Sequence, residues 1–165
     1  MRATIGLLAA GLALAACTPI VVDPPVSGLS PQARWEAGQA AYLAWNSHRR
    51  GWTTTHSGLQ YKCIQHGPKT GPKPERTSVV TIHYTGTFID GRKFDSSRDR
   101  GEPATFPLNR LILGWQEGVP MMHVGDRCLF AIPANIAYGA RYRDPIPANS
   151  ALLFDIELLA IPEGP

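Results

Sequence analysis

The sequence has few charged residues and no concentrated cluster of one sign. Charged side chains make up 18% of the 165 residues, and the formal charge is only +3. Proteins that bind nucleic acid normally carry a basic stripe, and its absence argues against nucleic acid as a partner. Hydrophobic residues make up 44%, which is the balance of a globular protein rather than a disordered one.

Two kinds of catalytic arrangement are also missing. The five histidines have no metal-ligand spacing, so we expect no metal, and nothing in the sequence calls for a cofactor. No Ser-His-Asp arrangement stands out, because Ser96 and Ser97 lack the small-residue elbow that exposes a nucleophilic serine. The sequence therefore argues against metal-dependent and serine hydrolysis.

The apolar run at residues 3–16 is too short to cross a bilayer comfortably as a helix, which takes about 20 residues. It follows Arg2 and ends in small residues, so residues 1–16 have the layout of a secretory signal peptide. The sequence at 14–17, LAAC, resembles the bacterial lipobox, which implies acylation of Cys17. The alternative is an ordinary signal peptide with an incidental cysteine. Thr18 in place of Asp favours the outer membrane over the inner one, with the protein facing the periplasm.

Two cysteines remain, Cys63 and Cys128, and each falls in a predicted strand. An exported chain meets an oxidising compartment, so a disulfide would form if the two strands were neighbours in register. The alternative is two buried thiols that behave as small apolar residues. Two buried thiols are the favoured expectation.

Residues 17–30 are rich in Pro, Gly and small side chains and predict a flexible tether. Ser30 and Pro31 then suit the cap and first position of a helix over 31–51. Alanines recur through it at helical spacing, and Gly51 suits the position just past its end. Its aromatic residues are large for an isolated helix and predict packing on the domain or on a partner: Trp35, Tyr42 and Trp45.

From residue 57 onward the apolar pattern changes to period two, as in half-buried strands. Strands are predicted at 59–64, around 80–84, at 105–108, 127–133 and 151–161. Asp90-Gly91 predicts a hairpin turn, and 114–122 predicts a short helix that Pro120 ends. The fold class is therefore α+β, with a curved antiparallel sheet wrapped around one short helix and preceded by the N-terminal helix.

Several segments resemble the FKBP family, the immunophilins that bind macrolides such as tacrolimus and rapamycin. They are VTIHYTGTFIDGRKFDSSRDRGEP (80–103), GWQEGVPMMHVGDR (114–127), IAYGA (136–140) and ALLFDIELL (151–159). They occur in the family's order and at nearly its spacing. The resemblance implies a peptidyl-prolyl cis-trans isomerase domain at 52–165, acting on proline-containing exported proteins, and possible partners among the macrolides.

The resemblance also implies the members of an aromatic pocket. Trp115 would form its floor, and Tyr84, Phe94 and Phe154 its walls. Leu111 and Ile112 match two aliphatic residues before the Gly-Trp pair. Phe106 is assigned either to the pocket or to the core.

Four of these positions would supply polar contacts. The backbone N–H of Ile112 and the hydroxyl of Tyr138 would bond carbonyl groups of the ligand. Asp95 would lie beside the twisted carbonyl, and Arg100 would hold Asp95 and Tyr84 in place.

The residue types suit rotation about an X–Pro bond, whose barrier is about 18–20 kcal/mol. No bond breaks, so no nucleophile is needed, and an apolar pocket favours the less polar twisted amide over the planar one. Ala104 departs from the aromatic rim residue of many members, and the loop 141–149 differs in length and charge. A binding module or holdase chaperone on the same fold is the alternative function, and a monomer is favoured over a dimer.

Overall fold

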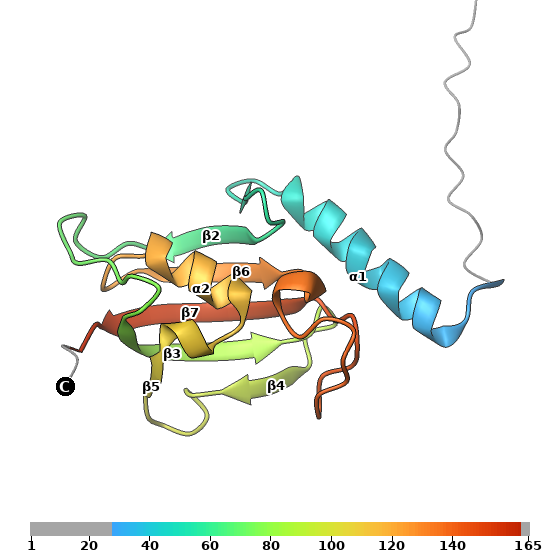
Figure 1. Cartoon of the computed structure of the whole chain (residues 1–165). Helices are drawn as coiled ribbons and strands as arrows, with labels where there is room; N and C mark the ends of the chain where they lie inside the picture. Colours follow the sequence, from blue (N-terminus) through green and yellow to red (C-terminus); the bar gives the residue numbers. More distant parts are fainter. Residues whose placement is uncertain (1–27, 163–165) are drawn as a thin grey trace, which may run out of the picture.

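The computed structural model describes residues 28–162. The predicted signal peptide, the lipobox with Cys17 and most of the predicted tether lie outside these residues. Seven strands form one antiparallel sheet in the order β1-β2-β6-β7-β3-β4, and β5 also pairs with β3 (Figure 1). The strands are β1 (Thr53–Thr54), β2 (Gln60–Gln65), β3 (Val79–Thr87), β4 (Lys93–Ser96), β5 (Ala104–Pro107), β6 (Arg127–Ile132) and β7 (Leu152–Ala160).

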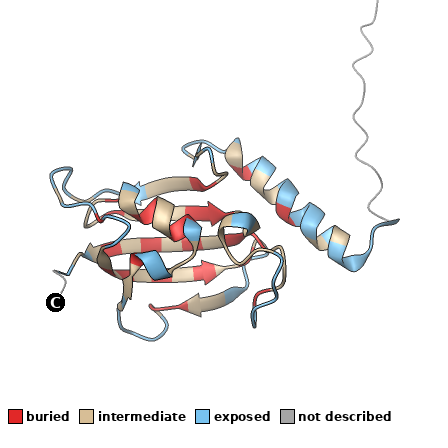
Figure 2. Cartoon of the chain, in the orientation of Figure 1, coloured by how far each residue is buried: buried red, intermediate tan, exposed pale blue. Residues whose placement is uncertain are grey.

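The core lies between one face of this sheet and the short helix α2 (Leu113–Gly118), as the buried residues in Figure 2 show. Alternate residues of β3 are buried, including Val80, Ile82 and Tyr84. Strand β7 alternates in the same way. The period-two pattern of the sequence is thus the pattern of a sheet with one face on the core, and the predicted α+β class is confirmed.

Two glycines let α2 lie directly on the sheet. A Cβ on Gly114 would come within 2.4 Å of the Ile132 side chain, and one on Gly118 within 2.5 Å of the Phe130 ring. The α-helix stops before Pro120, and a 3-10 turn (Val119–Met121) continues the chain. Close packing of α2 is what holds Trp115 against the middle of the sheet.

Strands β4 and β5 share one edge of β3, with a gap between them. β4 pairs with the end of β3, from Thr85 to Thr87, and β5 pairs with its beginning, from Val79 to Ile82. Tyr84 of β3 pairs with neither β4 nor β5, and the turn between these two strands passes beside it. This gap brings polar residues of the turn next to the centre of the sheet.

The helix α1 (Pro31–Ser47) begins as expected, because the Ser30 side chain accepts a hydrogen bond from the Ala33 N–H. It ends four residues before the predicted position 51. His48 caps it, and the Arg49 side chain turns back over the Trp45 ring at 4.6 Å. Gly51, at φ +83°, belongs to the following turn rather than to the helix end.

Polar side chains attach α1 to the domain. The buried Asn46 donates to Gln60 Oε1 at 2.8 Å, and Gln60 donates in turn to the Leu43 carbonyl. Gln39, also buried, accepts the Ala151 N–H at 3.1 Å. Most of the helix surface remains exposed (Figure 2), so α1 is joined to the sheet by a few specific hydrogen bonds rather than by an apolar stripe.

A disulfide joins Cys63 of β2 to Cys128 of β6. The two residues lie directly opposite each other in the β2–β6 ladder. The favoured expectation of two separate buried thiols is therefore wrong. The strands are neighbours in register, which is the condition that the sequence alone left open.

Candidate functional site

A pocket of about 430 Å³ opens beside α2 and the β3–β7 centre of the sheet. That volume is within the usual range of small-ligand sites, about 300–1,000 Å³. Its lining comprises Tyr84, Phe94, Asp95, Phe106, Arg110, Leu111, Ile112, Trp115, Tyr138, Arg143 and Phe154. The structure thus brings together nine of the ten residues predicted for the pocket, and the tenth, Arg100, contacts two of them.

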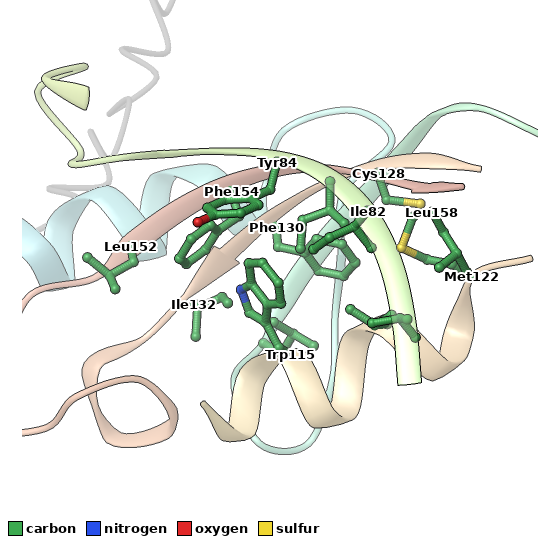
Figure 3. Packing of buried hydrophobic residues seen from close by; sticks show 14 of the residues in the cluster. Ile82, Tyr84, Trp115, Met122, Cys128, Phe130, Ile132, Leu152, Phe154 and Leu158 are labelled. Carbon is green, nitrogen blue, oxygen red and sulfur yellow. The ribbon is translucent and has the colours of Figure 1, made fainter. Parts of the chain in front are cut away.

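The pocket has an aromatic floor and walls that meet edge to face. The Trp115 ring lies 5.1 Å from Phe154 and 5.3 Å from Tyr84, with interplanar angles of 87° and 79°. Figure 3 shows Trp115 rising from its helix toward both rings on the sheet. Such edge-to-face contacts are the favoured geometry of aromatic pairs, and they fix the shape of the pocket without a ligand.

A glycine in β3 makes room for the outer wall. A Cβ on Gly86 would lie 2.6 Å from the Phe94 ring and 3.0 Å from the Phe154 ring. Phe94 and Phe154 themselves meet at 5.6 Å and 89°. Gly86 therefore sets the position of the Phe94 wall by leaving a space that any larger residue would fill.

Asp95 is held by two donors at the pocket edge. The Tyr84 hydroxyl donates to one carboxylate oxygen, and Arg100 donates to the other at 2.5 Å. Arg100 also donates to the Tyr84 oxygen at 3.1 Å, which closes a three-residue network. Both charged side chains are nearly half exposed, so the network lies where the pocket meets solvent.

This network shifts the protonation of its members. Burial acts to raise the pKa of Asp95, but hydrogen bonds from Tyr84 and Arg100 outweigh it, and the pKa lies below its usual value. Burial raises the pKa of Tyr84, and its bond to Asp95 raises it further. The bond to Tyr84, followed by that to Asp95, raises the pKa of Arg100. Near neutral pH the site therefore holds a carboxylate, a neutral phenol and a guanidinium.

Ser97 holds Tyr84 in place from the gap between β4 and β5. Its hydroxyl accepts the Tyr84 N–H at 2.8 Å, and its own N–H donates to the Tyr84 carbonyl at 3.0 Å. Ser97 is fully buried. Ser97 thus bonds the Tyr84 backbone where neither β4 nor β5 pairs with it. The sequence, in which Ser97 follows Asp95 and Ser96, did not reveal this positioning role.

Two polar groups of the pocket are left free to bond a ligand. The Ile112 N–H, at the start of α2, makes no hydrogen bond within residues 28–162. The Tyr138 hydroxyl likewise has no partner in the described part of the chain, and its half-buried ring lines the pocket. A donor and a hydroxyl thus face an otherwise aromatic and aliphatic surface.

The rim contains two residues that sequence reasoning missed, Arg110 and Arg143. Arg110 immediately precedes the predicted Leu111, and Arg143 lies in the loop whose unusual charge was noted. Ala104 is absent from the lining, although Phe106, two residues further along β5, is part of it. The rim therefore carries two positive charges, at Arg110 and Arg143, and neither residue lies in the segments that resemble the family.

Features of other kinds of site are absent from the part of the chain that the structure describes. Within residues 28–162, no three His, Cys, Asp or Glu side chains gather as a metal site would require. The described helices include none long and apolar enough to cross a membrane.

The structure therefore has an antiparallel sheet with an aromatic pocket beside its central strands. The profile of the family described as FKBP-type peptidyl-prolyl cis-trans isomerase matches residues 71–159. The chain belongs to this family.

Two bacterial proteins are among the relatives that this chain resembles. The chain is 56% identical to the FKBP-type peptidyl-prolyl cis-trans isomerase FkpA of Aeromonas hydrophila, over 73% of this chain and 44% of that protein. It is 43% identical to the outer membrane protein MIP of Legionella longbeachae, over 73% of this chain and 52% of that protein. The chain thus spans about half the length of these curated relatives.

A solved structure shows the same fold. The crystal structure of FkpA from Escherichia coli superposes with a TM-score of 0.77 at 38% identity, covering 81% of this chain and 62% of that one. The superposed part of the chain is longer than residues 71–159, which the family profile matches.

Proposed function

We propose that the protein accelerates cis-trans rotation of X–Pro bonds in exported proteins. The observation that carries this proposal is the preformed aromatic pocket floored by Trp115, with a free N–H at Ile112 and an ionised Asp95 at its edge. Its size and shape suit a proline ring, and family membership supports the same reaction.

The pocket's chemistry explains the acceleration without a covalent step. A planar amide is stabilised by resonance and has a large dipole, whereas the twisted amide has lost both. An aromatic surface that excludes water therefore binds the twisted form better than the planar one, and such differential binding lowers the barrier. The Ile112 N–H and the Tyr138 hydroxyl orient the flanking carbonyls, and orientation lowers the barrier further.

Asp95 acts on the rotating bond electrostatically. Its carboxylate is kept ionised and aimed by Tyr84 and Arg100, so it is preorganised before substrate arrives. Preorganised charges are effective because they need no rearrangement during the reaction.

A protease-coupled assay on acetyl-Ala-Leu-Pro-Phe-anilide tests the proposal. We expect the pure protein to accelerate isomerisation over background, and Asp95→Leu to lower kcat/KM about tenfold or more. A hydrogen bond to a charged group is worth roughly 1.5–3 kcal/mol. Asp99→Leu is the matched control, since Asp99 is an exposed carboxylate paired with Lys93 outside the pocket. A folded protein without activity would instead be a binding module or holdase.

We further propose that the protein is an envelope lipoprotein. In this proposal residues 1–16 are a signal peptide, Cys17 is acylated, residues 17–30 form a tether, 31–51 contain the helix, and 52–165 form the isomerase domain. The Cys63–Cys128 disulfide supports an oxidising compartment. The similarity to the outer membrane protein MIP of Legionella longbeachae supports the outer membrane. Intact-mass measurement of membrane-extracted protein tests acylation, which an unmodified mature N-terminus would contradict.

Two binding properties complete the proposal. The aromatic pocket suits macrolides of the tacrolimus and rapamycin type, which would compete with peptide. The chain is proposed to be a monomer, because α1 is a single helix attached to its own domain through Asn46 and Gln39. Inhibition by tacrolimus and the molar mass in solution test these two points.

A further inference from the structure

The mouth of the pocket carries two exposed arginines that have no acidic partner within residues 28–162. Arg110 ends the 3-10 turn that leads into Leu111 and Ile112, and its side chain lines the pocket. Arg143 lines it from the loop after Tyr138. The ion pairs of the described chain involve other arginines, so both guanidiniums are available to a ligand.

Arg143 is held at the mouth by its surroundings. Its backbone exchanges hydrogen bonds in both directions with Ile146, which is buried. Its guanidinium lies over the Tyr138 ring, 5.1 Å from the centroid. The backbone bonds to the buried Ile146 and the contact with the Tyr138 ring therefore hold the Arg143 guanidinium at the pocket mouth.

The other charges nearby do not cancel these two. Asp95, the one carboxylate in the pocket lining, is already paired with Arg100. Asp144, the acidic residue of the same loop, accepts the Tyr142 hydroxyl at 3.0 Å and does not line the pocket. A ligand that enters the pocket consequently meets a net positive rim above a neutral aromatic floor.

A peptide with its proline on Trp115 must pass its neighbouring side chains over this rim. We propose that the protein prefers X–Pro segments with an acidic residue next to the proline, because Arg110 and Arg143 attract its carboxylate. This inference rests on the proposed isomerase function and names its substrate class. Exposed ion pairs change an equilibrium by about two- to fivefold each, so the preference is a graded one.

The test compares acetyl-Ala-X-Pro-Phe-anilide peptides in which X is Glu, Gln or Lys. The acetyl group is essential, because a succinyl group would itself place a carboxylate near the rim. We expect kcat/KM for Glu to exceed that for Gln by about two- to fivefold, and that for Lys to fall below Gln. The Glu-to-Lys ratio should shrink toward one in 1 M salt, where the screening length is about 3 Å.

Charge reversal assigns the preference to the two arginines. In Arg110→Glu/Arg143→Glu the Glu-to-Lys ratio should invert, and a comparison of peptides within one variant cancels any general loss of activity. Arg34→Glu/Arg50→Glu is the matched control, since both residues are exposed, neither lines the pocket, and the net charge changes equally. That control should keep the ratio of the unchanged protein.

The outcomes separate this inference from the proposed function. Absence of acceleration on the Leu peptide contradicts the isomerase function itself. Acceleration with equal rates for Glu, Gln and Lys contradicts only the acidic preference. A ratio that changes equally in both double variants assigns the effect to net charge and also overturns the role of Arg110 and Arg143.

Discussion

At the scale of single residues, the proposed function depends on a carboxylate kept ionised at the pocket edge. Asp95 receives one hydrogen bond from Tyr84 and one from Arg100. Burial opposes its ionisation, but these two donors prevail and the pKa lies below its usual value. The charge is therefore present throughout the neutral range.

The depressed pKa of Asp95 predicts a flat pH profile. As pH falls, the carboxylate protonates only below the ordinary aspartate value of about 3.9, so kcat/KM should stay level from pH 8 to about 5. In Arg100→Gln the effect of burial is less opposed, the pKa rises, and the acidic loss of activity should begin at higher pH. Peptide exchange measured by NMR without a protease checks both profiles.

A loss of activity near pH 6.5 in the unchanged protein would contradict this role of Asp95 and would point to a histidine. Circular dichroism at each pH keeps unfolding apart from titration.

Sequence reasoning located the pocket residues through the family resemblance, since Tyr84, Asp95 and Trp115 belong to motifs of fixed spacing. It missed Arg110 and Arg143 because their place at the rim depends on the course of a turn and a loop. It also missed Ser97, because its role arises from the gap between two strands that share one edge of β3.

At the scale of elements, the position of α2 depends on two glycines, which have no Cβ. Gly114 and Gly118 face Ile132 and Phe130 at distances that no Cβ would tolerate. The helix thus carries Trp115 close enough to meet Tyr84 and Phe154. The sequence predicted this helix and the effect of Pro120, but not that Gly114 and Gly118 lie against the sheet.

Gly118→Ala should destabilise the protein by about 1–3 kcal/mol, as overpacking of a well-filled core does. It should also reduce activity, because the helix moves and Trp115 moves with it. Gly38→Ala is the matched control: it lies in α1 with open space around it, so it should stabilise by up to about 1 kcal/mol. Urea unfolding and the peptide assay measure both. Equal effects of the two changes would contradict the close packing of α2.

The helix α1 shows how tertiary contacts set an element's end. In the sequence, Gly51 indicates the end of the helix, yet the helix stops at Ser47. Asn46 is buried against Gln60, and Arg49 returns to contact Trp45 and Asn46. The bond between Asn46 and Gln60 involves a residue of the later sheet, so it was not available to a local pattern.

At the scale of the whole molecule, a covalent bond joins two neighbouring strands of the sheet, β2 and β6. The disulfide joins Cys63 and Cys128 across 65 positions of sequence. Their register follows from the pairing of β2 with β6, which local sequence patterns do not specify. The sequence therefore identified the candidate pair but not its pairing.

Reduction of this disulfide should lower the free energy of unfolding by about 2–4 kcal/mol, because the unfolded chain regains the freedom of a long loop. Urea unfolding with and without dithiothreitol measures the difference. Activity of the folded protein should remain, since neither cysteine lines the pocket. Unchanged stability in reductant would contradict a disulfide in the folded protein.

The most direct test of the account is exchange spectroscopy on acetyl-Ala-Leu-Pro-Phe-anilide with a small fraction of protein. A catalyst changes the rate of exchange between cis and trans but leaves their ratio unchanged. We predict faster exchange with an unaltered cis fraction, and a loss of the acceleration in Asp95→Leu with its fold retained. Exchange that stays at the uncatalysed rate with folded protein present would contradict the central claim that this aromatic pocket is a prolyl isomerase site.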